Sequence, residues 1–414
     1  MISILTFPFY FIPLIYSLQK DQFSAKTFFF VYSFLGCWLL SALLNSGVVT
    51  EQILIASWVI QEENIPFTTM AIINVLIFVF SSLKFKLPFN KKTNFKINSK
   101  KKLFYVSAAF ILVLLEFLIT LNLYSGLSNW VASSYSRTVI EDSRVNFLFP
   151  FVLAVNVFTL TLYAVNKNEK FKNLTKGLLY LTISLQILYL ALSGGRSILL
   201  LFLLSLVIIN IGRVSTKGAI KLALIAALFV LVSGYMISER YKAQGADAQF
   251  DTSLTNIVIA SYTGLPFIDH IALSQRYAEI NGYDYGEVYV NAATSFIPRS
   301  MWPEKPIQLS RKVRDEFWGD TDGGVPPGLF GEAIISLGIT GLIIIAVIYG
   351  FILSFVDSFC KSPDNVIVQR LRTAIFSTLI GFILIRGGID IGIYRVGLII
   401  AIYLTTEKFF LSKK

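Results

Sequence analysis

The chain has 414 residues, of which 55% are hydrophobic and only 15% are charged, and its formal net charge is +11. Soluble domains carry roughly 25% charged residues, so this composition excludes a soluble globular protein. The positive charge does not indicate nucleic acid, because most Lys and Arg residues lie in short segments between apolar runs, as the positive-inside rule describes. One histidine and two cysteines exclude a multi-histidine metal site and a disulfide framework.

Apolar runs long enough to cross a hydrocarbon core of about 30 Å follow one another along the chain. The first run has no basic segment before it and no small-residue cleavage site, so we expect a retained helix instead of a signal peptide. The pattern predicts an all-α, polytopic membrane bundle of about eleven transmembrane helices. The runs lie near residues 2–18, 27–45, 66–83, 103–121, 147–165, 176–192, 197–212, 218–237, 328–356, 371–386 and 393–408.

The basic residues between the runs predict how the bundle is oriented. Residues 84–102 hold eight lysines and no acid, so we expect this loop in the cytoplasm. Alternation then places the N-terminus outside, the C-terminus inside and every other basic segment in the cytoplasm. Residues 48–60 interrupt the count, because Glu51 and Gln52 favour a re-entrant or interfacial segment there. The other basic segments are those around Lys20, 167–176, 213–221, 361–372 and 408–414.

One long hydrophilic insertion, residues 238–327, separates an N-terminal eight-helix region (1–237) from the C-terminal membrane helices (328–414). The alternation predicts that this loop is extracytoplasmic. Residues 254–280 have apolar side chains at helical spacing, so we expect amphipathic helices that lie on the bundle. A loop of this length in a compact protein is usually functional or disordered, and its Trp and Phe content argues against disorder.

Two arginines stand beside paired glycines at the predicted outer face. Arg196 lies in LSGGRS and Arg386 in IRGGIDIGIYR. Glycine lets a backbone approach a ligand, and a guanidinium can bind two phosphate oxygens at once. Each arginine also has a plainer interpretation: Arg196 can reach lipid headgroups from a tight turn, and Arg386 can pair with Asp390. Together the two turns predict a cationic pocket for a diphosphate.

Other candidates are acidic, aromatic or titratable. Glu332, in GVPPGLFGEAIIS, could act as a general base, orient an arginine or only bond to a neighbouring helix, and Glu116 has a similar ambiguity. His270 is expected on the surface of an amphipathic helix, although a histidine can also act as a base. Arg299 lies between Pro298 and Pro303 in IPRSMWPEKP, where Trp302 could stack on a sugar ring.

The segment IPRSMWPEKP, the later GGVPPGLFGEAIISLGITG, the long outer loop and SGGRS together resemble the Wzy-type O-antigen and capsule repeat-unit polymerases. The resemblance covers about residues 100–400. It implies a bacterial inner-membrane glycosyltransferase whose fold is similar to the O-antigen ligases and to other GT-C-type membrane glycosyltransferases. The donor would be a growing glycan on undecaprenyl diphosphate, and the acceptor a single lipid-linked repeat unit.

The resemblance also assigns expected roles and partners. Positive charge must stabilise the leaving diphosphate, and arginines can supply it without a metal or cofactor. Asp320 and Asp322 form a DxD-like pair in a Gly-rich turn, but no further ligand is evident, so we expect no metal site. Membrane lipid, a chain-length regulator and a flippase are the further expected partners. The expected site comprises Glu332 and His270 as catalytic residues, Arg196, Arg386, Arg299 and Arg314 for the diphosphate, and Trp302 and Trp318 for the glycan.

Three other functions were compared with polymerisation. An O-antigen ligase shares the lipid donor and architecture, but the IPR–WP–KP segment favours the polymerase. A polysaccharide transporter or flippase usually shows repeat symmetry and charges at mid-membrane, whereas no internal repeat is found and the charges here crowd the outer face. A membrane acyltransferase lacks support, because His270 stands outside any acyltransferase motif.

Overall fold

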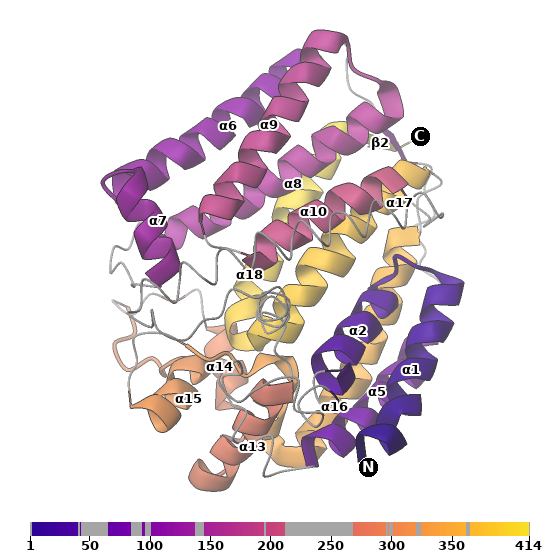
Figure 1. The fold of residues 1–414 in the computed structure, drawn as a ribbon, viewed down its shortest axis with the longest axis vertical. Helices are drawn as coiled ribbons and strands as arrows, with labels where there is room; N and C mark the ends of the chain where they lie inside the picture. Colours follow the sequence, from indigo (N-terminus) through magenta and orange to yellow (C-terminus); the bar gives the residue numbers. More distant parts are fainter. Residues whose placement is uncertain are drawn as a thin grey trace. The chain divides into compact units, whose positions relative to one another are not determined.

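The computed structural model describes residues 2–39, 42, 65–83, 93–95, 101–136, 145–193, 196–211, 268–294, 297, 301–319, 324–361 and 365–413. The chain forms two compact units that are interleaved in sequence (Figure 1). Unit 1 comprises Met1–Leu87, Leu265–Phe359 and Ile380–Gly397, and unit 2 comprises Pro88–Gly264, Cys360–Leu379 and Leu398–Lys414. The regions expected from the sequence (1–237, 238–327 and 328–414) are consecutive segments, whereas each compact unit combines segments from different parts of the chain.

Unit 1 contains the N-terminal helices, the helices of the long insertion and most of the apolar helix that follows it. Helix α1 packs against α2 and α5, and Phe29 of α2 contacts Phe330 and Tyr349 of α16, with ring centroids 6.2 and 5.5 Å away. The elements of this unit are α1 (Ile2–Lys20), α2 (Ala25–Ser33), the π-helix η1 (Phe34–Leu39), α5 (Ile65–Ser81), α13 (Ile268–Asn281), α14 (Glu287–Ala293), α15 (Leu309–Trp318), α16 (Gly328–Lys361) and the first part of α18 (Gly381–Phe410).

Two long helices of unit 1 are broken. Helix α16 loses helical dihedrals at Leu337 and Gly338, where Gly338 has φ 61°. Helix α18 is broken at Gly388, where φ is 72°. Glycine adopts positive φ without the steric penalty that other residues meet, so each break falls where the backbone tolerates it. The single helix expected over 328–356 therefore consists of two helical segments.

Unit 2 is built around α6 (Lys102–Leu123), α8 (Val145–Glu169) and α9 (Asn173–Leu192), which pack on one another. Polar side chains meet inside this packing: Thr120 and Tyr189 are hydrogen-bonded at 3.0 Å, and Gln186 donates to Asn156 at 3.0 Å. Glu116 is fully buried in the same unit. The remaining elements are α7 (Leu127–Ser136), α10 (Arg196–Ile211), α17 (Val366–Arg372), the π-helix η4 (Thr373–Ile380), β1 (Thr93–Phe95) and β2 (Leu411–Lys413).

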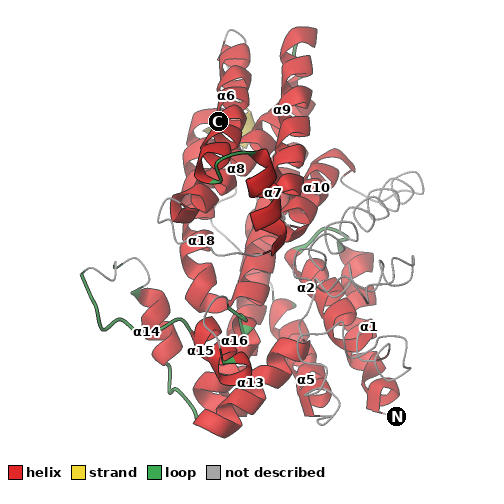
Figure 2. Ribbon diagram, turned by 60° about the vertical axis from the view of Figure 1, so that its left-hand side comes forward, coloured by secondary structure: helices red, strands yellow, loops and turns green. Residues whose placement is uncertain are grey.

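The helical prediction is confirmed, and the chain has the character of a multi-pass membrane protein. Each predicted apolar run is helical where the structure describes it, although the runs 371–386 and 393–408 are joined in α18, and Figure 2 shows that helices make up nearly all of that part. Five helices there are long and apolar enough to span a membrane, and three others are shorter. The expected total of about eleven is not confirmed, and residues 48–60 and 218–237 lie outside the described residues. The β1–β2 pair also departs from a purely all-α fold.

Segments predicted to share the cytoplasmic side lie together within unit 2. Strand β1 of the basic loop pairs antiparallel with β2 at the C-terminal end, with Asn94 opposite Ser412. Lys102 forms a salt bridge of 2.8 Å with Glu169, and Asn365 donates to Asn168 at 3.1 Å. These contacts join the predicted cytoplasmic segments 84–102, 167–176, 361–372 and 408–414. Their location in the cytoplasm stays a prediction.

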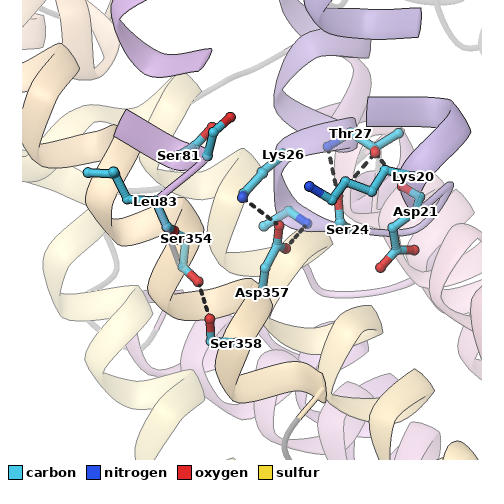
Figure 3. Close-up of polar contacts among 12 residues, drawn as sticks. Lys20, Asp21, Ser24, Lys26, Thr27, Ser81, Leu83, Ser354, Asp357 and Ser358 are labelled. Carbon is cyan, nitrogen blue, oxygen red and sulfur yellow. Dashed lines mark hydrogen bonds and ion pairs between the residues drawn. The ribbon is translucent and has the colours of Figure 1, made fainter. Parts of the chain in front are cut away.

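Segments predicted to share one side of the membrane also meet within unit 1 (Figure 3). Asp357, near the end of α16, accepts a hydrogen bond of 2.6 Å from the Ala25 backbone amide and lies 4.0 Å from the Lys26 ammonium. Ser354 donates to the Leu83 carbonyl, just after α5. The chain after α1, the chain after α5 and the end of α16 therefore meet, as a shared side of the membrane requires.

Candidate functional site

The two motifs PPGLFGE and IRGGID, far apart in sequence, meet in unit 1 through Glu332. This residue lies near the start of α16 and is only 1% exposed. Its carboxylate accepts a hydrogen bond of 2.5 Å from the Ile389 backbone amide, directly after the break in α18. The first amides of a helical segment have no partner within the helix, and a carboxylate there is favoured by the helix dipole. Glu332 therefore caps the helical segment that starts at Ile389.

The backbone around this cap is tightly packed. A Cβ atom added at Gly388 would overlap both carboxylate oxygens of Glu332. One at Gly328 would lie 2.5 Å from the Ile385 carbonyl oxygen. Arg386, two residues before Gly388, is half-buried in this packing. The structure thus brings together two of the predicted site residues, Glu332 and Arg386, on segments that fix each other's position.

His270 is not the surface residue that the sequence suggested. It is 5% exposed, and its Nδ1 is hydrogen-bonded to the Pro326 carbonyl. The neighbouring residues Ile271, Ala272 and Leu273 are also buried, because α13 is covered on more than one side. The amphipathic pattern assigned one water-facing side to this helix and therefore misplaced His270. In the structure the histidine joins α13 to the segment just before α16.

Polar contacts connect the helices of the long insertion to one another. Lys312 of α15 forms a salt bridge of 2.8 Å with Glu287 of α14. Asn281, at the end of α13, donates to Glu316 of α15 at 3.1 Å. Lys305, from the WPEKP segment, donates to the Thr294 carbonyl at 3.0 Å, just past α14. A cation is favoured at a helix C-terminus, so Lys305 has a structural role that explains one part of the motif.

The structure describes three predicted glycan and phosphate residues of the insertion, Trp302, Arg314 and Trp318, among these helices. Trp302 is half-buried next to the Lys305 contact, and Arg314 is half-buried in α15. Trp318 is 41% exposed at the end of α15, where its ring lies 6.0 Å from that of Phe317. An exposed indole at a helix end can stack on a sugar ring, whereas Trp302 offers only part of its surface.

Tyr289 was missed from the sequence. It lies in α14, and burial raises the pKa of its hydroxyl to about 12, with the nearby Glu332 carboxylate adding to the rise. The Tyr289 hydroxyl, which is protonated at neutral pH as in any ordinary tyrosine, thus lies near the acid that caps Ile389. A seven-residue helix without a motif gave no signal for it.

Further predicted residues lie in unit 2 or outside the described residues. Arg196 begins α10 in unit 2, and its side chain lies outside the described part of the chain. Arg299, Asp320 and Asp322 also lie outside it. Within the described residues, no group of three or more His, Cys, Asp or Glu side chains could hold a metal ion. Unit 1 therefore provides a buried carboxylate, a protonated phenol and an arginine. They lie on tightly packed backbone segments, one of which is broken at a glycine.

Comparison with known proteins adds one finding. A family model described as "Putative O-antigen polymerase" matches residues 2–403. No curated protein and no solved structure matches the chain. The family match covers both interleaved units, and it contains the Glu332 and Arg386 motifs and every other predicted site residue.

Proposed function

The chain belongs to the O-antigen polymerase family, and we propose that it is a membrane glycosyltransferase that transfers a growing glycan from undecaprenyl diphosphate to the next lipid-linked repeat unit. The family match over residues 2–403 carries this proposal. The many apolar helices support it, since both substrates are anchored in a membrane. The contact between the PPGLFGE and IRGGID motifs adds local support, because it joins the buried Glu332 carboxylate to the segment that carries Arg386.

The proposed reaction exchanges one bond for another at the donor's anomeric carbon. A hydroxyl oxygen at the acceptor's non-reducing end bonds to that carbon, while the bond from the carbon to the diphosphate oxygen breaks. The hydroxyl proton passes to a base, and undecaprenyl diphosphate leaves with the bonding electrons. Negative charge therefore develops on the leaving group, and fixed positive charge there lowers the barrier.

We assign Arg386 to the leaving diphosphate and Glu332 to the positioning of the backbone that carries it. Glu332 is almost completely buried and already accepts the Ile389 amide, which supports positioning over proton abstraction. Arg196, Arg299 and Arg314 remain proposed partners of the diphosphate, and Trp302 and Trp318 of the glycan. His270, buried against Pro326, fits a supporting role better than that of the base.

A reconstituted reaction tests the proposal. Purified protein in lipid nanodiscs, given synthetic undecaprenyl-diphosphate repeat units, should yield lipid-linked products of two and more repeats. In a host that makes lipopolysaccharide, deletion of the gene should leave lipid A core capped with a single repeat. Uncapped core would instead indicate a ligase, and a lack of chain extension by the purified protein would contradict the proposal.

A further inference from the structure

The turn between α13 and α14 presents an aromatic residue on an unusual backbone. Tyr285 has φ 50°, the left-handed region that non-glycine residues rarely adopt, and its side chain is 80% exposed. Such a conformation is strained and persists only where the surroundings enforce it. Its ring has one described aromatic neighbour, Tyr283, whose centroid is 6.4 Å away. Packing of the Tyr285 ring inside the protein does not explain the strain.

What enforces the conformation is the break in α16. The amides of Asp284 and Tyr285 donate to the carbonyls of Ile335 and Ser336, at 3.0 and 3.2 Å. These carbonyls end the first helical segment of α16 and would otherwise lack partners. The Asp284 carboxylate in turn accepts the Gly286 amide at 2.9 Å. These hydrogen bonds hold the turn against the carbonyls that precede the break at Gly338.

The second segment of α16 begins directly after this break and has an exposed apolar side. Residues 339–356 carry no charged side chain, and at 1.5 Å per residue they extend about 27 Å, close to the thickness of a hydrocarbon core. Their exposed large apolar side chains recur at helical spacing, as expected for one face of a helix. They are Ile339, Ile343, Ile344, Ile348, Ile352 and Phe355, which are 40–65% exposed.

The position of Tyr283 joins the turn to this face. A Cβ atom at Gly338 would lie 2.8 Å from the Tyr283 hydroxyl oxygen, so the tyrosine lies directly against the break. The exposed apolar side begins at Ile339, the next residue. Tyr283 is itself 50% exposed. Two exposed tyrosines thus stand where the hydrocarbon-length segment starts, and tyrosine is enriched at that depth because its ring is apolar and its hydroxyl is polar.

We propose that the Tyr283–Tyr285 turn is a membrane-interface anchor, seated in the lipid headgroup layer at this end of α16. Its partner is the bilayer surface, which would cover the exposed rings and offset the strain at Tyr285. The anchor fixes the depth of α13 and α14, and with them the height of Tyr289 and Glu332 above the hydrocarbon. The inference depends on the membrane character of the chain and not on the proposed reaction.

Site-directed spin labelling measures the depth directly. Tyr285→Cys is labelled with a nitroxide in nanodiscs that hold one copy of the protein, and access to oxygen is compared with access to a water-soluble nickel chelate. Cys37 and Cys360 are buried, so the unsubstituted protein reports the background. Arg276→Cys, on an exposed position of α13, is the aqueous control, and Ile343→Cys is the lipid control.

The anchor predicts an oxygen-to-nickel ratio at Tyr285 several-fold above that at Arg276 and below that at Ile343. A ratio equal to that at Arg276 would overturn the proposal, because the turn would then lie in water. Low access to both reagents would also overturn it, since protein and not lipid would cover the ring. Tyr283→Cys gives a second reading if the first variant does not fold, as judged by gel filtration.

Discussion

The backbone amide of Ile389 donates a 2.5 Å hydrogen bond to the carboxylate of Glu332, and Gly388 leaves room for that carboxylate. Gly388→Ala should therefore strongly reduce O-antigen chain length. A methyl group would overlap Glu332, and the positive φ alone costs on the order of 1–3 kcal/mol for a non-glycine residue. Gly397→Ala, in the same helix, is the matched control, since a Cβ there meets no atom within 4 Å. Equal lipopolysaccharide ladders from both variants would contradict the packing described.

Substitutions of Glu332 separate a positioning role from a base role. Glu332→Gln keeps an oxygen that can accept the Ile389 amide, so it should retain activity within about tenfold, whereas Glu332→Ala should lose it. Initial rates of chain extension by purified variants make the comparison. If the Glu332→Gln variant is as inactive as the Glu332→Ala variant while both proteins fold, the carboxylate takes part in proton transfer.

Arg386→Ala should abolish polymerisation and leave the amount of protein in the membrane near normal. Arg386→Lys should also be poor, because an ammonium lacks the two-pronged geometry that binds a diphosphate. Arg196→Ala is expected to behave in the same way. Arg276→Ala serves as control, since that arginine is exposed on α13 and contacts Glu279 only three residues away. A normal ladder from either alanine variant would remove that arginine from the site.

Sidedness can be tested by thiol labelling in intact cells. Glu304→Cys, exposed in the long insertion, should react with a membrane-impermeant maleimide. Asn94→Cys and Ser412→Cys should both be protected until the membrane is opened, because β1 and β2 pair and so share one side. Labelling of residue 94 in intact cells would mean that the predicted orientation is inverted, and the assignment of an outer site would fail with it.

Chain extension should continue in excess EDTA. The arginines proposed for the diphosphate supply positive charge without a bound cation. The measurement is in vitro polymerisation with and without EDTA, followed by addition of Mg²⁺ or Mn²⁺. If EDTA stops the reaction and either metal restores it, Asp320 and Asp322 become the first residues to substitute.

Hydropathy predicted the helices well because a backbone in lipid must satisfy its own hydrogen bonds, and a helix does so locally. The breaks were harder to predict. Gly338 and Gly388 lie in sequences rich in glycine, and nothing local distinguishes Gly388 from Gly387. The difference comes from Glu332, which reaches Gly388 from another helix.

The candidate site was predicted in part. Glu332 and Arg386 were chosen as unusual charges near apolar runs, and the structure joins their segments, but the capping role of Glu332 depends on a contact across 57 residues. His270 was misplaced because periodicity reports one face of a helix, whereas α13 is covered on more than one. The sequence did not predict Tyr289 or the β1–β2 pair. The helix of Tyr289 and the two strands are very short, and their contacts are with residues far away in the chain.

The pairing of β1 with β2 also has a consequence for the order of assembly. Asn94 and its partner Ser412 are separated by about three hundred residues of chain. At ribosomal speeds of roughly 5–20 residues per second, β1 waits on the order of 15–60 s for its partner. During that interval its backbone amides have no strand to pair with, and the lysine-rich loop is open to other contacts. The β1–β2 pair thus closes late in synthesis, after most membrane helices have been inserted, and chaperones or proteases could act on the loop until then.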